Sequence, residues 1–128
     1  MKYWLFKTEP GSYSIQDLER DGSTFWDGVR NYQARNLLRD EIQPGDTVFL
    51  YHSNADPPGI VGLAKVVEGG GVDPSAFQDG HHYFDPKSSA DAPRWYGVTI
   101  AHERTFTQGL GLPELRTIPG LEEMLVLR

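Results

Sequence analysis

The segment from Phe25 to Leu38, FWDGVRNYQARNLL, constrains the fold of this chain more than any other stretch. Asp27 and Gly28 favour a turn, because glycine adopts positive φ at no steric cost. Asn31 is a preferred helix N-cap residue, and the residues from Tyr32 to Arg39 are expected to be helical. Backbone N–H groups at a helix start are free and favour anions. The segment therefore predicts a turn with aromatic rings at a helix start, which suits the binding of a nucleotide.

Each residue of this segment also has a purely structural interpretation. Trp26 alone could pack in a core, and Asn31 alone could serve only as a cap. The arginines could form a solvated face: Arg30, Arg35 and Arg39. A core, however, does not need a tryptophan, amides and several arginines in so short a stretch. Base recognition by stacking, hydrogen bonding and phosphate contact uses these types, so the combination favours a binding role.

Composition limits the architecture and the location. The 128 residues allow one domain with a single core, and 14 Gly with 9 Pro predict many turns and strands. Cysteine is absent, which excludes disulfides and thiolate metal sites. We find no apolar run long enough to cross a bilayer and no signal-peptide pattern, so we expect a soluble, cytoplasmic protein with no membrane partner.

The net charge of −6 argues against broad, non-specific binding of nucleic acid, because such binding needs many contacts between basic residues and phosphates. Any such binding would depend on a local basic rim. The candidates for this rim are Lys7, Arg30, Arg35, Lys87 and Arg94. Affinity for unmodified duplex is expected to be weak and sensitive to salt.

Several stretches have the composition of strands: Lys2–Thr8, Thr47–Ser53, Ile60–Val67 with a bulge at Gly62, and Arg94–Thr107. Ser14 followed by Asp17 predicts a short capped helix. The sequence ends with an expected short helix at Leu112–Arg116 and a strand or helix at Met124–Leu127. Together they predict a mixed sheet of about five or six strands, curled into a barrel with short helices on it.

The stretch from Glu68 to Asp91 is expected to be mostly loop, and a long loop in a compact domain is usually functional or mobile. Gly69 to Gly71 lacks the Lys-Ser/Thr of a phosphate-binding loop and is interpreted as a flexible turn. A helical turn is expected at Pro74 to Phe77. The nearby polar cluster matches no defined metal motif and is better explained as an exposed loop: His81, His82 and Asp85. We expect neither a metal nor a cofactor.

Segments spread along the chain carry a family resemblance: YWLFKTEP (Tyr3–Pro10), YSIQDL (Tyr13–Leu18), WDGVRNYQARN (Trp26–Asn36), GDTVFLYHS (Gly45–Ser53), GIVGLAKV (Gly59–Val66), YFDPKS (Tyr83–Ser88) and PRW (Pro93–Trp95). Together they resemble the EVE domain, as in the thymocyte nuclear protein family and its bacterial relatives. The resemblance implies an α+β, PUA-like fold, a small curled antiparallel β-barrel with short peripheral helices. It also implies a non-catalytic pocket for a flipped-out modified nucleobase, with modified cytosine in DNA the leading ligand and RNA an alternative.

The resemblance further implies which residues form the pocket. Trp26 would be the ring on which the base stacks, and Asn31 and Gln33 would reach the polar edge of the base. Lys7 and Thr8 would lie at the mouth of the pocket. The opposite side would be lined by the end of a strand: Tyr51, His52 and Ser53. Contacts with backbone phosphates fall to basic residues: Lys7, Arg30, Arg35 and Arg94.

The chain also departs from the family pattern. The family commonly has serine where this chain has Thr8, which keeps the hydroxyl. Family members usually continue beyond a segment like GLEEMLVLR into a further strand, whereas this chain stops at Arg128. The single domain over residues 1–128 is therefore expected either to close its barrel differently or to lack that strand. Trp95 is assigned to the core.

Two other classes of function stay open. His52 and Ser53 are strand neighbours that face opposite ways, so they cannot form a base–nucleophile pair, and we find no constellation that demands catalysis. An enzyme acting on a modified base or nucleoside would have to use Glu9 or Asp27. A protein-interaction module would show an exposed apolar patch and would tolerate the loss of Trp26. The acidic charge mildly favours this module, or a free nucleoside ligand, over a duplex binder.

Overall fold

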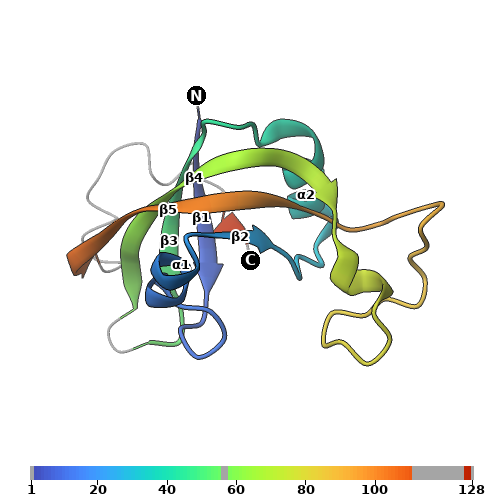
Figure 1. The fold of residues 1–128 in the computed structure, drawn as a ribbon, viewed down its shortest axis with the longest axis horizontal. Helices are drawn as coiled ribbons and strands as arrows, with labels where there is room; N and C mark the ends of the chain where they lie inside the picture. Colours follow the sequence, from blue (N-terminus) through green and yellow to red (C-terminus); the bar gives the residue numbers. More distant parts are fainter. Residues whose placement is uncertain (1, 56–57, 111–125, 128) are drawn as a thin grey trace.

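The computed structural model describes residues 2–55, 58–110 and 126–127. Within these ranges, one sheet contains the strands β1 (Tyr3–Thr8), β2 (Ser23–Trp26), β3 (Thr47–His52), β4 (Gly59–Val72), β5 (Tyr96–Leu110) and β6 (Val126–Leu127). The helical elements are α1 (Ile15–Asp21), α2 (Tyr32–Asn36), its π-helical continuation η1 (Leu37–Glu41) and a 3-10 turn η2 (Pro74–Phe77). Figure 1 shows β4 and β5 as long curved strands, with α1 and α2 lying beside the sheet.

The strands lie in the order β2-β5-β4-β3-β1-β6. Pairings among β2, β5, β4 and β3 are antiparallel, whereas β1 runs parallel to both β3 and β6. The parallel pairing of β1 with β3 follows from the long connection through α1, β2 and α2, because parallel neighbours need a crossover. The expected α+β fold with a curled sheet is confirmed, and in the described ranges its two outer strands do not pair to close it.

The core lies under α1 and η1, against the inward side chains of the strands. Phe6, Leu18 and Leu38 are fully buried there, one each from β1, α1 and η1. Trp4 on β1 donates its indole N–H to Asp46 Oδ2 over 2.9 Å. Burial alone would raise the pKa of the Asp46 carboxyl, but hydrogen bonds from the turn that follows η1 and from the start of the chain lower it.

Local sequence signals located both helix starts correctly. The Ser14 side chain accepts from the Asp17 N–H, and the Asp17 carboxylate accepts in turn from the Ser14 N–H, forming a capping box. Asn31 caps α2 by accepting from the Ala34 N–H over 3.0 Å. The expected bulge is also present, because the register between β3 and β4 shifts at Gly62. The helix expected at Leu112–Arg116 lies outside the described residues.

The expectation of a flexible turn at Gly69 to Gly71 is wrong, because these glycines lie inside β4. A Cβ atom built on Gly70 would lie 2.7 Å from the Leu38 carbonyl oxygen and 2.8 Å from the Arg39 Cα. Glycine is therefore needed for the close approach of η1 to the strand. The loop predicted from Glu68 begins only at Asp73, after β4 ends.

None of the helices in the described ranges is both long enough and apolar enough to cross a membrane.

Candidate functional site

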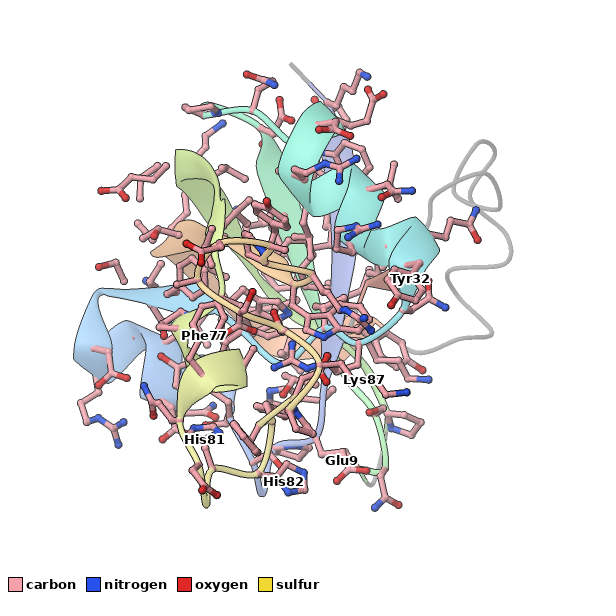
Figure 2. The ribbon with its side chains drawn as sticks, turned by 90° about the vertical axis from the view of Figure 1, so that its right-hand side faces the viewer. Glu9, Tyr32, Phe77, His81, His82 and Lys87 are labelled. Carbon is pink, nitrogen blue, oxygen red and sulfur yellow. The ribbon has the colours of Figure 1, made fainter. Side chains whose placement is uncertain are left out.

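A cavity of about 770 Å³ opens where β1 and β2 end, which is within the usual size range of small-molecule sites. Its lining comes from the end of β1 and the turn after it, from the β2–α2 segment and from the loop after η2. The lining residues are Lys7–Glu9, Ser12, Tyr13, Thr24–Asn31, Gln33, Ala34, Leu37, His82 and Tyr83. Figure 2 faces the side of the molecule on which Glu9 and His82 lie.

Trp26, the last residue of β2, belongs to both the cavity and the core. Its side chain is only 7% exposed, and its ring centroid lies 5.2 Å from that of Phe6. Tyr13 meets it edge-on at 6.3 Å between centroids. The buried indole Nε1 has no hydrogen-bond partner among the described residues. Trp26 therefore packs in the core, as its structural interpretation expects, and it also forms a wall of the cavity.

The Asp27–Gly28 turn forms a second wall. Gly28 has φ +79°, and its N–H donates to Asp73 Oδ2 over 2.9 Å. The ring of Tyr83 packs directly on the Gly28 backbone, where a Cβ atom would overlap it. Glycine at this position thus permits both the turn and the close approach of the aromatic ring.

Arg30 lines the cavity, and its guanidinium also pairs inside the protein, a contact that its expected phosphate role did not include. Its Nη1 lies 3.0 Å from Asp73 Oδ2, and its Nη2 donates to the Tyr83 carbonyl oxygen over 2.6 Å. The guanidinium also lies over the rings of Tyr83 and Trp95, at 5.5 and 5.3 Å from their centroids. Arg30 therefore fastens the loop after β4 to the turn after β2.

Asp73 is the centre of this connection and is completely buried. Burial alone would raise the pKa of its carboxyl, but hydrogen bonds from Ser75, Gly28 and Arg30 reverse the effect and lower that pKa. Ser75 contributes both its hydroxyl, at 2.6 Å, and its backbone N–H, at 2.9 Å. The Asp73 carboxylate is thus charged and accepts several hydrogen bonds, and it connects the segments that form the walls of the cavity.

The structure brings Lys7, Thr8, Asn31 and Gln33 together with Trp26 around the cavity, as the sequence predicted. The Asn31 side chain has a fixed orientation, because its Oδ1 accepts from the Ala34 N–H. The Asn31 Nδ2 is without a partner within the described ranges. The Asn31 amide therefore presents its N–H donors to the cavity, whereas its oxygen already accepts a backbone hydrogen bond.

Tyr51, His52 and Ser53 do not line the cavity, which corrects the expectation for them. All three are buried. His52 Nε2 accepts from the Ile15 N–H over 3.1 Å, and burial lowers the pKa of the imidazole. The strand end therefore supports the start of α1. The Ser53 hydroxyl is buried without a hydrogen-bond partner in the described part of the chain.

Arg35 and Arg94 also lie outside the cavity lining. Arg35 donates from Nη1 to the Arg94 carbonyl oxygen over 2.7 Å and lies 5.0 Å from the centroid of the Tyr32 ring. Tyr32 in turn stacks on Trp95 at 4.8 Å. Trp95 is buried as expected, and its indole donates to Asp85 Oδ2 over 2.6 Å. This stack braces α2 against the segment before β5.

The family model described as the EVE domain matches residues 2–128. The chain belongs to the EVE domain family. Thymocyte nuclear protein 1 of Mus musculus is 41% identical to this EVE domain over 90% of the chain and 55% of the mouse protein. The Danio rerio protein of the same name is 41% identical over 88% and 53%. The chain thus spans about half the length of these relatives.

Solved structures share the fold of this EVE domain. A protein of Pseudomonas putida is 45% identical, with a TM-score of 0.88 over 94% of this chain and 80% of that one. The human THYN1 protein, solved in complex with 5-methylcytosine-containing DNA, is 39% identical. It has a TM-score of 0.84 over 90% of this chain and 73% of the human chain.

Sequence reasoning missed part of the cavity of this EVE domain. Tyr13 and Tyr83 contribute rings, and Asp27 contributes a carboxylate that the sequence assigned only to a turn or to catalysis. Burial raises the pKa of Asp27, and the nearby charge of Asp73 raises it further. The tyrosines lie within YSIQDL and YFDPKS, so those two motifs carried the signal. In the described part of the chain, no three histidine or acidic side chains gather as a metal site would require.

Replacing Gly28 by alanine is expected to destabilise the EVE domain by about 1–3 kcal/mol from backbone strain, and further by displacing the Tyr83 ring. Gly80→Ala is the matched control, since Gly80 also has positive φ but has nothing within 4 Å of a built Cβ. Urea unfolding of both variants measures the difference. Equal losses in the two variants would show that Tyr83 does not depend on Gly28.

Proposed function

We propose that this EVE domain binds DNA carrying a modified cytosine, takes the modified base into the cavity, and carries out no chemistry on it. The observation that carries the proposal is the cavity itself, which is lined by the aromatic residues Tyr13, Trp26 and Tyr83 and also by Asn31. Flat rings and fixed donors are what base recognition uses. The complex of human THYN1 with 5-methylcytosine-containing DNA supports the same ligand class.

The energetics of the proposal require more than stacking. Stacking a base on an aromatic side chain contributes roughly 1–3 kcal/mol. Extruding a base from duplex DNA costs a few kcal/mol, so stacking on Trp26 about offsets extrusion. Burying one methyl group adds about 0.8 kcal/mol, roughly fourfold in affinity. Hydrogen bonds at the edge of the base, at about 1–3 kcal/mol for a good pair, must therefore supply the remaining selectivity.

The charge distribution limits how the domain holds the rest of the nucleic acid. Because Arg30 and Arg35 are engaged within the protein, the remaining candidates for phosphate contacts are Lys7 at the cavity, Lys87, and Arg94, whose hydrogen bonds within the described ranges involve only its backbone. Figure 2 shows Lys87 on the same face as Glu9 and His82. With few such contacts and a net charge of −6, unmodified DNA is bound weakly. The base in the cavity then determines most of the affinity.

The test is fluorescence anisotropy with labelled oligonucleotides that carry cytosine, 5-methylcytosine, 5-hydroxymethylcytosine or N6-methyladenine, at 50 and 200 mM salt. We expect a modified cytosine to bind at least about fourfold more tightly than cytosine. With two or three phosphate contacts, log affinity should fall by about 2 to 3 per tenfold rise in salt. RNA of the same sequence distinguishes the polymer. Equal affinity for all four bases at both salt concentrations would contradict the proposal.

A further inference from the structure

A cavity that selects 5-methylcytosine must also reject thymine. The two bases have the same ring size and the same C5 methyl group, so stacking and methyl burial cannot separate them. They differ at position 4, where cytosine carries an amino donor and thymine a carbonyl acceptor. They differ also at N3, which accepts in cytosine and donates in thymine. Selection therefore needs one fixed acceptor and one fixed donor at this edge.

Asn31 supplies a donor whose orientation the fold determines. The Oδ1 of Asn31 is occupied as the cap of α2, at 3.0 Å from the Ala34 nitrogen. The amide cannot be turned over without leaving that N–H unpaired, which costs stability. Its Nδ2 hydrogens therefore remain the group presented to a ligand. An acceptor such as cytosine N3 matches them, and the N3–H of thymine does not.

Asp27 supplies the acceptor. It lies in the cavity lining directly after Trp26, on the turn that leads to Asn31. No hydrogen bond or ion pair joins its carboxylate to another residue of the described ranges. The nearest cation on this turn, Arg30, is paired with Asp73 instead. Its own backbone N–H is the protein donor to this carboxylate, so a donor from the ligand would stabilise its charge further.

We infer that Asp27 and Asn31 together read the edge of the base: the Asp27 carboxylate accepts from the N4 amino group of cytosine and the Asn31 amide donates to N3. The inference rests on the proposed function and adds to it a basis for selecting amino-pyrimidines over keto-pyrimidines. Burial and the nearby charge of Asp73 raise the pKa of Asp27, although its own backbone N–H and the charges of His81 and Arg30 act in the opposite direction, so a further donor from a ligand would stabilise the charged carboxylate. Against thymine, the same pair would set acceptor against acceptor and donor against donor.

The test compares duplex oligonucleotides that carry either 5-methylcytosine or thymine at one position and are otherwise identical. In both duplexes, the partner strand has the same gap opposite that position. The quantity measured is the ratio of the two affinities, in which general effects of charge cancel. In Asp27→Asn, the new amide can donate to thymine O4. In Asn31→Asp, the helix cap is kept because aspartate caps as well as asparagine, but the donor becomes an acceptor. Each change is expected to lower the ratio about tenfold.

Glu9→Gln is the matched control, because it removes the same charge from the cavity lining and is expected to leave the ratio unchanged. A wild-type protein that prefers 5-methylcytosine to thymine, with either Asp27→Asn or Asn31→Asp keeping that preference, overturns the inference alone. A wild-type protein that binds no modified cytosine better than cytosine overturns the proposed function, and the inference with it. Thermal unfolding of each variant confirms that folded proteins are being compared.

Discussion

Trp26→Ala is expected to lower the free energy of unfolding by about 3–5 kcal/mol and to abolish selective binding of a modified base. The loss of stability and the loss of selective binding both follow from the position of the Trp26 ring. The ring is almost fully buried against Phe6, so truncation leaves a void in the core. The same ring lines the cavity, so truncation also removes a stacking surface. Urea unfolding and oligonucleotide binding, measured on the same preparation, test the two effects.

Two further variants separate stability from recognition. Trp26→Phe keeps a ring and loses no hydrogen bond within the described ranges, because the indole Nε1 makes none there. It should remain folded and bind more weakly while still preferring the modified base. Trp4→Phe removes a buried indole and its bond to Asp46, outside the cavity lining, and should destabilise the fold with selectivity unchanged. Full selectivity in folded Trp26→Ala would contradict the role of this ring.

What the sequence predicted correctly was mainly local. The caps at Ser14 and Asn31 depend on residues three positions apart, so residue type and spacing suffice to identify them. The glycines from Gly69 to Gly71 show the opposite case. Gly70 among them is needed for the close approach of η1 to β4, and no residue beside it in the sequence indicates a neighbour so far away along the chain. A glycine-rich run was therefore interpreted as a turn when it is a strand.

The site shows the same division. Its position could be predicted because Trp26 and Asn31 share one continuous motif, and the family resemblance added Lys7 and Thr8. The orientation of the Arg30 side chain could not be predicted, because its partner Asp73 lies 43 residues further along the chain. Residue type alone suggested that a basic side chain beside a binding motif meets phosphate. Pairing with a buried carboxylate took precedence, since an unpaired buried charge is far costlier than a lost surface contact.

That pairing leads to the second large prediction. Arg30→Ala is expected to destabilise the protein by about 3–5 kcal/mol, because it leaves the fully buried Asp73 without its cation. It also removes the donor to the Tyr83 carbonyl oxygen, so the aromatic wall of the cavity loses its anchor. Affinity for a modified base should therefore fall as well, because the Tyr83 ring lines the cavity. Urea unfolding at pH 7 measures the stability loss.

The stability loss caused by Arg30→Ala is expected to depend on pH. In the wild type, the pKa of Asp73 lies below its ordinary value of 3.8, so the network contributes stability above that pH and loses it as the pH falls through the folded-state pKa. In Arg30→Ala, burial remains while a compensating partner is gone, so the pKa of Asp73 should rise. The difference in unfolding free energy between wild type and variant should therefore be largest near neutral pH and become smaller below about pH 4.

Arg35→Ala is the matched control, because Arg35 donates to a carbonyl oxygen rather than to a buried carboxylate. This substitution should cost about 1 kcal/mol at every pH. If the gap for Arg30→Ala were as small and as flat with pH as the gap for Arg35→Ala, Asp73 would not be the charge that holds the cavity together.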